Sequence, residues 1–432
     1  MLRQNGGGIL NIRLPRLEGV DLRFTAPPSK SGTHRALIAA SLAPEGSSVI
    51  SRPLRSEDTL CTREGLCRMG VRMTYTGENI HVDGAGCRLD GGEGEVTIDC
   101  RNSGTTLRLL TSVALLHRHP VTLTGSARMQ ERPIGPLADA LRTIGGDFVY
   151  GKKYGYPPFT VSGTLLGGRV SIDAGISSQF VSSVMMAAPC AREPVEITLY
   201  GREVSRSYLD MTADVMERFG AGVTHAGDGS IQIDNSGYRA TDYRVEGDYS
   251  SASYFFAMAA VCGGRVTVGN LNPSSLQGDR RMLAILSEMG CSVSAHGEEV
   301  TVERDGPLCG LSLPMEQTPD IIQTVAAVAC FAQTPTTIEG TANLRHKESD
   351  RVAAVAAVCR CAGAVVEVGE DSVVIHPRSS PGGGILDPAD DHRTAMSAAV
   401  VAMGRGDVTI TGAECVRKSF PGFWDALREA GI

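Results

Sequence analysis

The sequence predicts an α/β fold of six repeated units, because the same series of features recurs about every 70–75 residues. Each unit opens with a short polar turn, and a helix rich in alanine, leucine and valine follows. A β-like run comes next. A second, amphipathic helix then closes the unit and ends at a glycine.

The six polar turns predict helix starts, since Ser, Asn and Asp side chains cap the free N–H groups there. Helix N-termini are partly positive and offer hydrogen-bond donors, so they attract anions. If the units pack with common polarity, these ends share one end of the structure. The turns occupy residues 29–31, 102–105, 177–179, 250–253, 319–320 and 390–393.

The β-like runs and the closing glycines define the rest of each unit. Glycine is the expected residue after a helix, because it enters the left-handed region without a Cβ penalty. The runs span residues 48–50, 121–124, 195–200, 265–268, 336–339 and 407–411. The glycines are Gly70, Gly145, Gly220, Gly290, Gly363 and Gly431.

Six units suggest two domains of three. We expect one domain to comprise residues 28–248 and the other to comprise residues 1–27 and 249–432. The strand-like stretch 9–14 would complete the C-terminal domain. The chain would then cross between domains near residues 25–29 and 243–248. The glycine run 382–384 is interpreted as a surface loop.

Composition limits the class of protein. The 432 residues carry a formal net charge of −7, whereas nucleic-acid-binding proteins usually have a basic excess. No apolar run reaches the roughly 18 residues that span a bilayer. The first eight residues lack the apolar core of a signal peptide. We therefore expect a cytoplasmic protein that binds neither nucleic acid nor membrane.

The twelve cysteines include no CxxC pair, and the chain has no HExxH motif. We therefore expect no metal site. Reduced cysteines acting as small apolar residues fit a cytosolic protein.

Three clusters of charged residues suggest anion binding. Lys30, Ser31 and Arg35 would form a phosphate or carboxylate clamp at a helix start. The segment 128–133 holds two arginines beside a proline that would open a helix. The segment 343–351 places Lys347 and Arg351 on one predicted helix face. Taken singly, each also fits a plain alternative: a capped surface helix, a solvated loop or an i,i+4 salt-bridged surface.

Together the turns and their neighbours are rich in cations, which suits a substrate or pair of substrates with several negative charges. The few carboxylates among them are candidates for proton transfer. The cations are Lys30, Arg35, Arg108, Arg132, Lys347, Arg351, Arg393 and Lys418, and the carboxylates are Asp320, Glu348 and Asp391.

All of these residues except Asp320 lie within a set of nine ordered motifs that resembles the 3-phosphoshikimate 1-carboxyvinyltransferase (EPSP synthase) family over nearly the whole chain. The segment 26–35 is more similar to archaeal than to enterobacterial members. The motifs are PSKSxxxR (28–35), NSGTxxR (102–108), RMxERPIG (128–135), SSQF (177–180), VEGDxSSASY (245–254), QGD (277–279), KESDR (347–351), DHR (391–393) and KSFP (418–421).

The resemblance implies an enolpyruvyl transferase-like fold of two domains, each of three βαβαββ units, joined by a two-strand hinge. It implies transfer of the enolpyruvyl group of phosphoenolpyruvate to the 5-hydroxyl of shikimate 3-phosphate by addition and elimination. These small molecules would be the partners of a monomeric enzyme that uses no metal and no organic cofactor.

The resemblance also implies the site residues. Asp320, Glu348 and Lys30 would carry the catalytic proton transfers. Shikimate 3-phosphate would lie on Lys30, Ser31, Arg35, Ser177, Ser178, Gln179, Ser205, Tyr208, Asp320, Asn343 and Lys347. Phosphoenolpyruvate would lie on Lys30, Asn102, Gly104, Arg132, Gln179, Arg351, Arg393 and Lys418. Since these residues divide between the two domains, we expect closure on substrate binding.

Five positions depart from the family pattern. Arg101 stands where the family usually has glycine, and Arg206-Ser207 replaces Lys-Pro before Tyr208. His346 and Thr394 replace apolar residues. None of these changes removes a residue with an implied role.

Three rival readings remain open. The related enolpyruvyl transferase that acts on UDP-N-acetylglucosamine usually carries Cys or Asp on a mobile loop, and the stretch 126–132 has neither. A catalytically silent binding member would be expected to lack Asp320, Glu348 or Lys30, and all three are present. An RNA-end cyclase would be expected to have a basic surface.

Overall fold

The computed structural model describes residues 10–44, 46–92, 94–202, 204–227, 229–377 and 382–432. The chain divides into two compact units. Unit 1 comprises Met1–Pro27 and Glu246–Ile432, and unit 2 comprises Pro28–Val245. The expected domain boundary near residue 248 lies three residues after Val245, the last residue of unit 2. The questions of order in residues 1–8 and of a strand at Ile9 fall outside the described residues.

Unit 2 contains three α/β repeats, each with its own four-stranded sheet. The second repeat is β6 (Val96–Asp99), α3 (Gly104–Val113), β7 (Val121–Thr124), α4 (Gly135–Thr143), β8 (Gly146–Tyr150) and β9 (Phe159–Gly163). The third is β10 (Gly168–Asp173), α5 (Ser178–Ala187), β11 (Val195–Tyr200), α6 (Ser207–Arg218), β12 (Val223–His225) and β13 (Ile231–Ile233). Both follow the predicted βαβαββ order.

The first repeat of unit 2 takes its first strand from the far end of the unit. It consists of α1 (Lys30–Leu42), β3 (Ser47–Ser51), α2 (Glu57–Arg68), β4 (Arg72–Thr76) and β5 (Asn79–Asp83). The missing strand is β14 (Tyr243–Arg244), which pairs in parallel with β3. Chain order and spatial order therefore differ at this point.

Unit 1 repeats the same pattern. Its first repeat is β2 (Val20–Thr25), α7 (Tyr249–Cys262), β15 (Gly264–Gly269), α8 (Arg281–Glu288), β16 (Ser292–His296) and β17 (Glu299–Arg304). Its second is β18 (Ser312–Pro314), α9 (Ile322–Ala329), β19 (Thr336–Glu339), α10 (Arg351–Cys361), β20 (Val365–Val368) and β21 (Ser372–His376). The N-terminal strand β2 pairs in parallel with β15 and so completes the first sheet.

The last repeat of unit 1 ends differently. It consists of β22 (Gly384–Leu386), α11 (His392–Arg405), β23 (Val408–Ile410) and α12 (Phe423–Glu429). In place of a closing hairpin, the N-terminal β1 (Ile12–Arg13) pairs antiparallel with β23. Gly384, expected in a surface loop, instead begins β22 and pairs with Val408.

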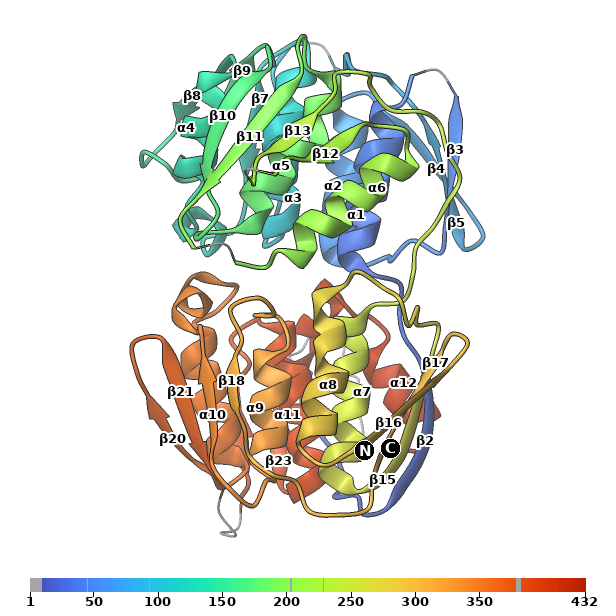
Figure 1. The fold of residues 1–432 in the computed structure, drawn as a ribbon, viewed down its shortest axis with the longest axis vertical. Coiled ribbons are helices and arrows are strands. Elements are labelled where there is room, and N and C mark those ends of the chain that lie inside the picture. The colour runs from blue at the N-terminus through green and yellow to red at the C-terminus, as the bar shows by residue number, and fades with distance from the viewer. Residues whose placement is uncertain (1–9, 45, 93, 203, 228, 378–381) are drawn as a thin grey trace. The chain divides into compact units, whose positions relative to one another are not determined.

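The first helix of each repeat lies in the core of its unit, and the second covers the outside. In unit 1, α7, α9 and α11 contact one another and run side by side (Figure 1). A helix that is apolar all round belongs in a core. Nearly every residue of α7 and α11 is buried, whereas α8 buries only Met282, Ile285 and Leu286 on one face.

The glycines predicted to end the second helices are confirmed by the backbone. All six have positive φ, from 77° at Gly363 to 111° at Gly290. The predicted β-runs also appear as β3, β7, β11, β15, β19 and β23. These local signals therefore set the spacing of the repeats.

The predicted helix starts are correct except at two turns. Ser29, Ser103, Ser177 and Asp391 are N-caps whose side chains accept backbone hydrogen bonds. The turn expected at 250–253 is wrong, because those residues lie inside α7 and the N-cap is Asp248. Asp320 lies before α9 but does not cap it, since the N-cap is Ile321 and makes no side-chain cap.

The cysteines differ from expectation at one pair. Cys87 and Cys190 form a disulfide that closes a sequence separation of 103 residues within unit 2. Ten cysteines are free, and most of them are buried as expected. Burial raises the pKa of Cys61 and of Cys262 to about 12, which keeps these thiols protonated.

Along the described part of the chain, every helix is too short or too polar to cross a membrane. In the same part, no group of three or more His, Cys, Asp or Glu side chains is placed to hold a metal ion.

Candidate active site

The polar starts of the helices meet at one end of unit 2. The Gln179 Nε2 at the start of α5 donates to the Thr105 Oγ1 at the start of α3, at 3.2 Å. Arg108 Nη1, one turn into α3, donates to Gln179 Oε1 at 2.6 Å. Thr106 Oγ1 donates to the backbone oxygen of Asp58 in α2 at 3.0 Å. The shared end that the repeat suggests is therefore present within this unit.

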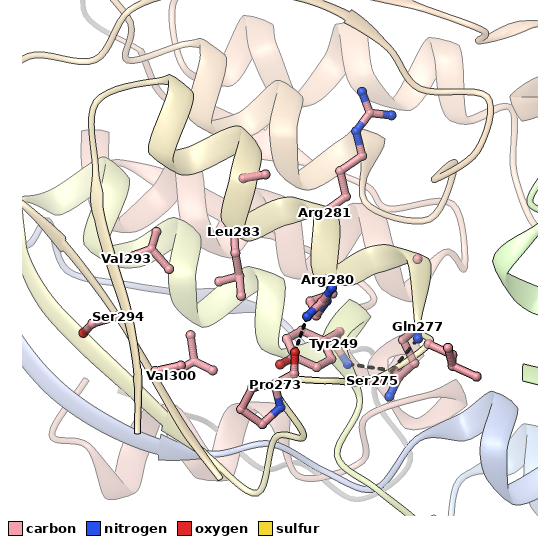
Figure 2. A pocket seen from close by; sticks show the side chains of 14 residues that line it. Tyr249, Pro273, Ser275, Gln277, Arg280, Arg281, Leu283, Val293, Ser294 and Val300 are labelled. Atoms are coloured by element: carbon pink, nitrogen blue, oxygen red, sulfur yellow. Dashed lines mark hydrogen bonds between the residues drawn. The ribbon is translucent and has the colours of Figure 1, made fainter. Parts of the chain in front are cut away.

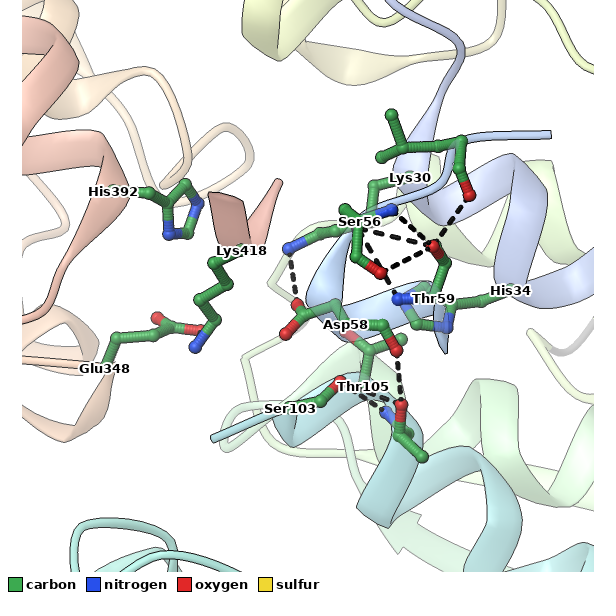
Figure 3. Close-up of polar contacts among 12 residues, drawn as sticks. Lys30, His34, Ser56, Asp58, Thr59, Ser103, Thr105, Glu348, His392 and Lys418 are labelled. Atoms are coloured by element: carbon green, nitrogen blue, oxygen red, sulfur yellow. Dashed lines mark hydrogen bonds and ion pairs between the residues drawn. The ribbon is translucent and has the colours of Figure 1, made fainter. Parts of the chain in front are cut away.

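Lys30, Ser31 and Arg35 occupy the first turns of α1. Ser29 caps the helix by accepting from the backbone N–H of Gly32 at 3.2 Å. Lys30 Nζ lies 2.9 Å from Asp58 Oδ2 (Figure 3). The sequence did not single out Asp58, since its place beside Lys30 depends on the packing of α1 against α2.

Arg35 is almost fully buried and connects α1 to α6 by hydrogen bonds. Its Nε donates to Thr212 Oγ1 at 2.8 Å, and its Nη1 donates to the backbone oxygen of Ser31 at 3.0 Å. Its Nη2 donates to the backbone oxygen of Tyr208 at 3.3 Å. Burial lowers the pKa of Arg35 to about 10. Arg35 thus remains a cation at neutral pH and is held by groups from α6.

Gly104 lies directly against the guanidinium of Arg132. A Cβ placed on Gly104 would lie only 2.6 Å from Arg132 Nη1 and 2.8 Å from its Cζ. Glycine at this position therefore lets the Arg132 side chain approach the start of α3. Arg132 follows the short helix η2 (Met129–Glu131), and α4 opens at Gly135. The expectation that Pro133 opens this helix is wrong.

Arg101 sits in the left-handed conformation that explains why glycine is usual there. Its φ is 49°, a value that non-glycine residues rarely adopt. Its backbone N–H bonds Asp99 Oδ1 at 2.8 Å, and its side chain pairs with Glu64 at 2.7 Å. These contacts hold the turn that leads through Asn102 to Gly104, the first residue of α3.

The remaining predicted residues of unit 2 lie at the starts of α5 and α6. Ser177 caps α5 by accepting from the N–H of Gln179 at 3.3 Å, and Ser178 is buried in its first turn. Ser205 has a φ of 58°, and Tyr208 lies in the first turn of α6.

In unit 1 the guanidinium of Arg351 organises the site. Its side chain is 2% exposed and contacts three carboxylates. Nε donates to Asp391 Oδ2 at 2.9 Å, Nη1 to Asp320 Oδ1 at 3.1 Å and Nη2 to Glu348 Oε2 at 2.8 Å. Burial alone would lower the pKa of Arg351, but the negative charges of these neighbours raise it.

Two further cations share the same carboxylates. Arg393 Nη2 lies 3.2 Å from Asp320 Oδ2, and its Nη1 donates to the Asp320 backbone oxygen at 2.9 Å. Lys418, at the end of η6 (Ala413–Lys418), lies 3.5 Å from Glu348 Oε1 (Figure 3). Three cations and two candidate proton-transfer carboxylates therefore converge in one cluster within unit 1.

Asp391 supports this cluster through its contact with Arg351 and through two further hydrogen bonds. It caps α11 by accepting from the Arg393 N–H at 3.0 Å, and it accepts from Ser349 Oγ at 3.0 Å.

Thr394, which departs from the family pattern, accepts from Gln323 Nε2 at 2.8 Å. Its hydroxyl therefore provides a hydrogen bond to a buried amide.

Asn343 lies in η5 (Ala342–His346), and Lys347 directly follows this helix. Arg351 begins a separate helix, α10, whose N-cap is Asp350. The expectation that Lys347 and Arg351 share one helix face is therefore wrong. The turn between the two helices instead brings Glu348 beside Arg351.

Asp279 is a buried carboxyl of the QGD motif to which the sequence assigned no role. It is 4% exposed and accepts a short hydrogen bond from Ser250 Oγ. Burial, and next the negative charge of Asp320, raise the pKa of Asp279 to about 7. The QGD motif marked this residue, but only its burial beside Asp320 reveals its unusual titration.

A cavity of about 570 Å³ lies elsewhere in unit 1, beside α8, β16 and β17 (Figure 2). Its lining mixes apolar residues such as Leu283 and Val300 with polar ones such as Gln277 and Arg280. Arg281 at its edge donates to the Pro314 backbone oxygen at 2.6 Å. None of the predicted site residues lines this cavity. The charged helix starts, and not this cavity, therefore form the candidate active site.

Comparison with known proteins identifies the family. Residues 17–427 match the sequence model of EPSP synthase (3-phosphoshikimate 1-carboxyvinyltransferase). The 3-phosphoshikimate 1-carboxyvinyltransferase of the methanogen Methanoculleus marisnigri is 56% identical, over 98% of this chain and 99% of that protein. The Aliivibrio fischeri enzyme of the same name is 37% identical, over 97% and 99% respectively.

The fold comparison agrees. The structure of EPSP synthase from Acinetobacter baumannii superposes with a TM-score of 0.80 at 25% identity and covers 98% of both chains. The predicted α/β class and enolpyruvyl transferase-like fold are thereby confirmed. With a match that spans nearly its whole length, the chain belongs to the EPSP synthase (3-phosphoshikimate 1-carboxyvinyltransferase) family.

Proposed function

We propose that the polar and charged residues at the helix starts described above bind the substrates of this enzyme and catalyse its reaction. As a 3-phosphoshikimate 1-carboxyvinyltransferase of the shikimate pathway, it transfers the enolpyruvyl group of phosphoenolpyruvate to shikimate 3-phosphate. The products are 5-enolpyruvylshikimate 3-phosphate and inorganic phosphate. The observation that carries the assignment of residues is the convergence of Arg351, Arg393 and Lys418 on Asp320 and Glu348.

Shikimate 3-phosphate carries one phosphate and several hydroxyls, so it requires cations together with hydroxyl and amide groups. Lysine and arginine at helix starts suit the phosphate, because the N–H groups nearby add to their charge. The proposed set is Lys30, Ser31, Arg35, Ser177, Ser178, Gln179, Ser205, Tyr208, Asp320, Asn343 and Lys347.

Phosphoenolpyruvate carries a phosphate and a carboxylate on a small frame, so it requires a denser group of cations. Arg351 Nη1 and Arg393 Nη2 each contact an oxygen of the Asp320 carboxylate, which supports the proposal that these guanidinium groups bind an anionic substrate. The proposed set is Lys30, Asn102, Gly104, Arg132, Gln179, Arg351, Arg393 and Lys418.

The chemistry needs one group to accept a proton and one to donate a proton in the addition step. Asp320 would accept the 5-hydroxyl proton as that oxygen bonds to C2 of phosphoenolpyruvate. Glu348 would protonate the methylene carbon C3, and Lys30 would share this work. In the elimination step, C3 loses a proton and the C2–O bond to phosphate breaks.

The test is phosphate release from phosphoenolpyruvate by purified protein. We expect release only when shikimate 3-phosphate is present, and equal release with UDP-N-acetylglucosamine would contradict the acceptor assignment. Asp320→Asn and Glu348→Gln should each lower turnover at least about a hundredfold, as loss of a positioned acid or base does. Substrate binding should persist in both variants.

The control for these variants is Asp425→Asn, which removes an exposed carboxylate on α12 that pairs with Arg428 at 2.7 Å. It should retain normal turnover. If Asp320→Asn or Glu348→Gln behaved like this control, the corresponding catalytic role would be wrong.

We also propose that the enzyme is a monomer and that it is located in the cytoplasm. Size-exclusion chromatography with light scattering should give the mass of one chain, 45.5 kDa. A mass of twice that value would refute the monomer.

A further inference from the structure

Lys30 has a buried acidic partner. Its Nζ lies 2.9 Å from Asp58 Oδ2, and the two side chains are 14% and 4% exposed. Asp58 lies in the first turn of α2, whereas Lys30 begins α1. An ion pair this far from water is subject to less screening than a surface pair. The pair therefore fixes the direction of an ammonium on a long, flexible side chain.

Asp58 is itself held by the helix that carries Gly104. Its backbone oxygen accepts from Thr106 Oγ1, which also contacts Ser103 Oγ at 2.8 Å. The N-terminus of α2 is set by a capping box in which Ser56 and Thr59 bond reciprocally. Contacts with two helices, α2 and α3, thus hold Asp58 in place independently of its contact with Lys30.

A chain of hydrogen bonds extends this support to His34, one turn after Lys30 on α1. Thr62 Oγ1 lies 2.7 Å from Thr106 Oγ1 and 2.7 Å from His34 Nδ1. Because Thr106 uses its proton on the Asp58 oxygen, Thr62 must donate to Thr106, and His34 Nδ1–H must donate to Thr62. Burial lowers the pKa of His34 to about 3, so the imidazole stays neutral.

We propose that Asp58 is the positioning residue for Lys30, and that the chain from His34 through Thr62 and Thr106 holds it in place. The inference rests on the proposed role of Lys30 in binding both substrates and in proton transfer. An ammonium has three N–H donors, so a bond to Asp58 directs the other two. Asp58 thereby acts on the reaction through Lys30.

The first test measures Lys30 without using catalysis. Lysine amines of the full chain are labelled with a trace of acetic anhydride and quantified by mass spectrometry, with exposed Lys152 as the internal reference. Asp58→Asn should raise the labelling of Lys30 relative to Lys152 several-fold, because the ammonium loses its partner. Unchanged relative labelling would overturn the proposal.

The second test is a double-mutant cycle on the affinity for shikimate 3-phosphate, measured by calorimetry. Asp58→Asn should weaken binding and lower turnover about tenfold to a hundredfold, as removal of a supporting partner typically does. In a Lys30→Ala background the same change should weaken binding less than about twofold, since the residue it positions is gone. Equal losses in both backgrounds would show that Asp58 acts independently of Lys30.

Two further variants separate positioning from folding. Glu57→Gln removes the neighbouring first-turn charge of α2, which is exposed, and should leave binding and turnover unchanged. Asp58→Glu keeps the charge and should restore part of the lost affinity. If Glu57→Gln lowered binding and turnover as much as Asp58→Asn does, the effect would come from removing a negative charge at the start of α2 and not from the contact with Lys30. Failure of the wild type to release phosphate would refute the proposed function, while the labelling test would still decide this inference.

Discussion

Arg351 shows how one residue can hold several carboxylates of unit 1 in place. It bonds Asp320, Glu348 and Asp391 at the same time, and its side chain is almost fully buried. Breaking a buried pair by removing one partner leaves an uncompensated charge, which typically costs about 3–5 kcal/mol. The carboxylates that we assign to proton transfer therefore depend on this guanidinium for their position.

Asp279 gives a pH-dependent prediction at the same scale. Burial and Asp320 raise its pKa from 3.8 to about 7. Between these values the folded protein holds a proton that the unfolded chain has lost, so stability falls as pH rises from about 4 to 7. The loss is on the order of 4 kcal/mol from roughly three pH units and is complete above the folded pKa.

Asp279→Asn should remove this loss, because an amide does not titrate. Urea unfolding of the wild type and the variant between pH 4 and 8 measures the free energy of unfolding of each protein. The variant should gain stability relative to the wild type as pH rises. A stability difference that stays constant across this range would show that Asp279 does not titrate as the structure indicates.

Gly104 provides a steric prediction. A Cβ there would lie 2.6 Å from Arg132 Nη1, so Gly104→Ala must displace the end of this side chain. We expect a weaker apparent affinity for phosphoenolpyruvate by roughly 1–3 kcal/mol, with the affinity for shikimate 3-phosphate nearly unchanged. Steady-state kinetics with each substrate varied in turn will measure it. Gly422→Ala, where an added Cβ meets open space, is the control.

At the scale of elements, the Cys87–Cys190 disulfide joins the segment after β5 to the short helix that follows α5 (Ala188–Cys190). A cross-link over 103 residues restricts the unfolded chain more than a short one does. Under the proposed cytoplasmic location cysteines are normally reduced, so this bond should form on oxidation and open with reductant.

We predict that replacing Cys87 and Cys190 by serine lowers the free energy of unfolding of the oxidised protein by about 2–4 kcal/mol. Added dithiothreitol should bring the wild type to the stability of the variant. Cys309→Ser, which removes an exposed free cysteine, should have no comparable effect. Denaturant unfolding with and without reductant measures all three, and an insensitive wild type would show that the bond does not form.

The elements also show which helix starts local sequence can define. Asp391 caps α11 and at the same time bonds Arg351, so one side chain serves the helix and the site. Asp320 is not the N-cap residue of α9, and its carboxylate pairs with Arg351 and Arg393. These ion pairs join residues far apart in the sequence, so a local capping pattern does not predict them.

At the scale of the whole molecule, the proposed residues for shikimate 3-phosphate come from both units. The strands β2 and β14 lead from each unit into the other along the chain. Shikimate 3-phosphate should therefore slow amide hydrogen exchange at the starts of α1 and α5 and also in the segment 342–351. Exchange in α12 should not change. Protection confined to one unit would contradict the proposed set.

By itself the sequence determined the repeat, the β-runs, the closing glycines and the motifs that identify the family. These features depend on local physics: capping side chains, a left-handed glycine after a helix and alternating polarity in strands. All six predicted glycines have positive φ for this reason. The Ser250–Ser253 turn failed because serines also fit the first turns of a buried helix when another residue, Asp248, supplies the cap.

Only the tertiary structure decided which charges meet. Asp58 lies beside Lys30 because α1 packs against α2, and Asp279 titrates near neutrality because it is buried next to Asp320. Lys347 lies just after η5 and Arg351 begins α10, so the chain turns between these two residues and they share no helix face. Such pairings depend on long-range packing and burial, which no local pattern of residues encodes.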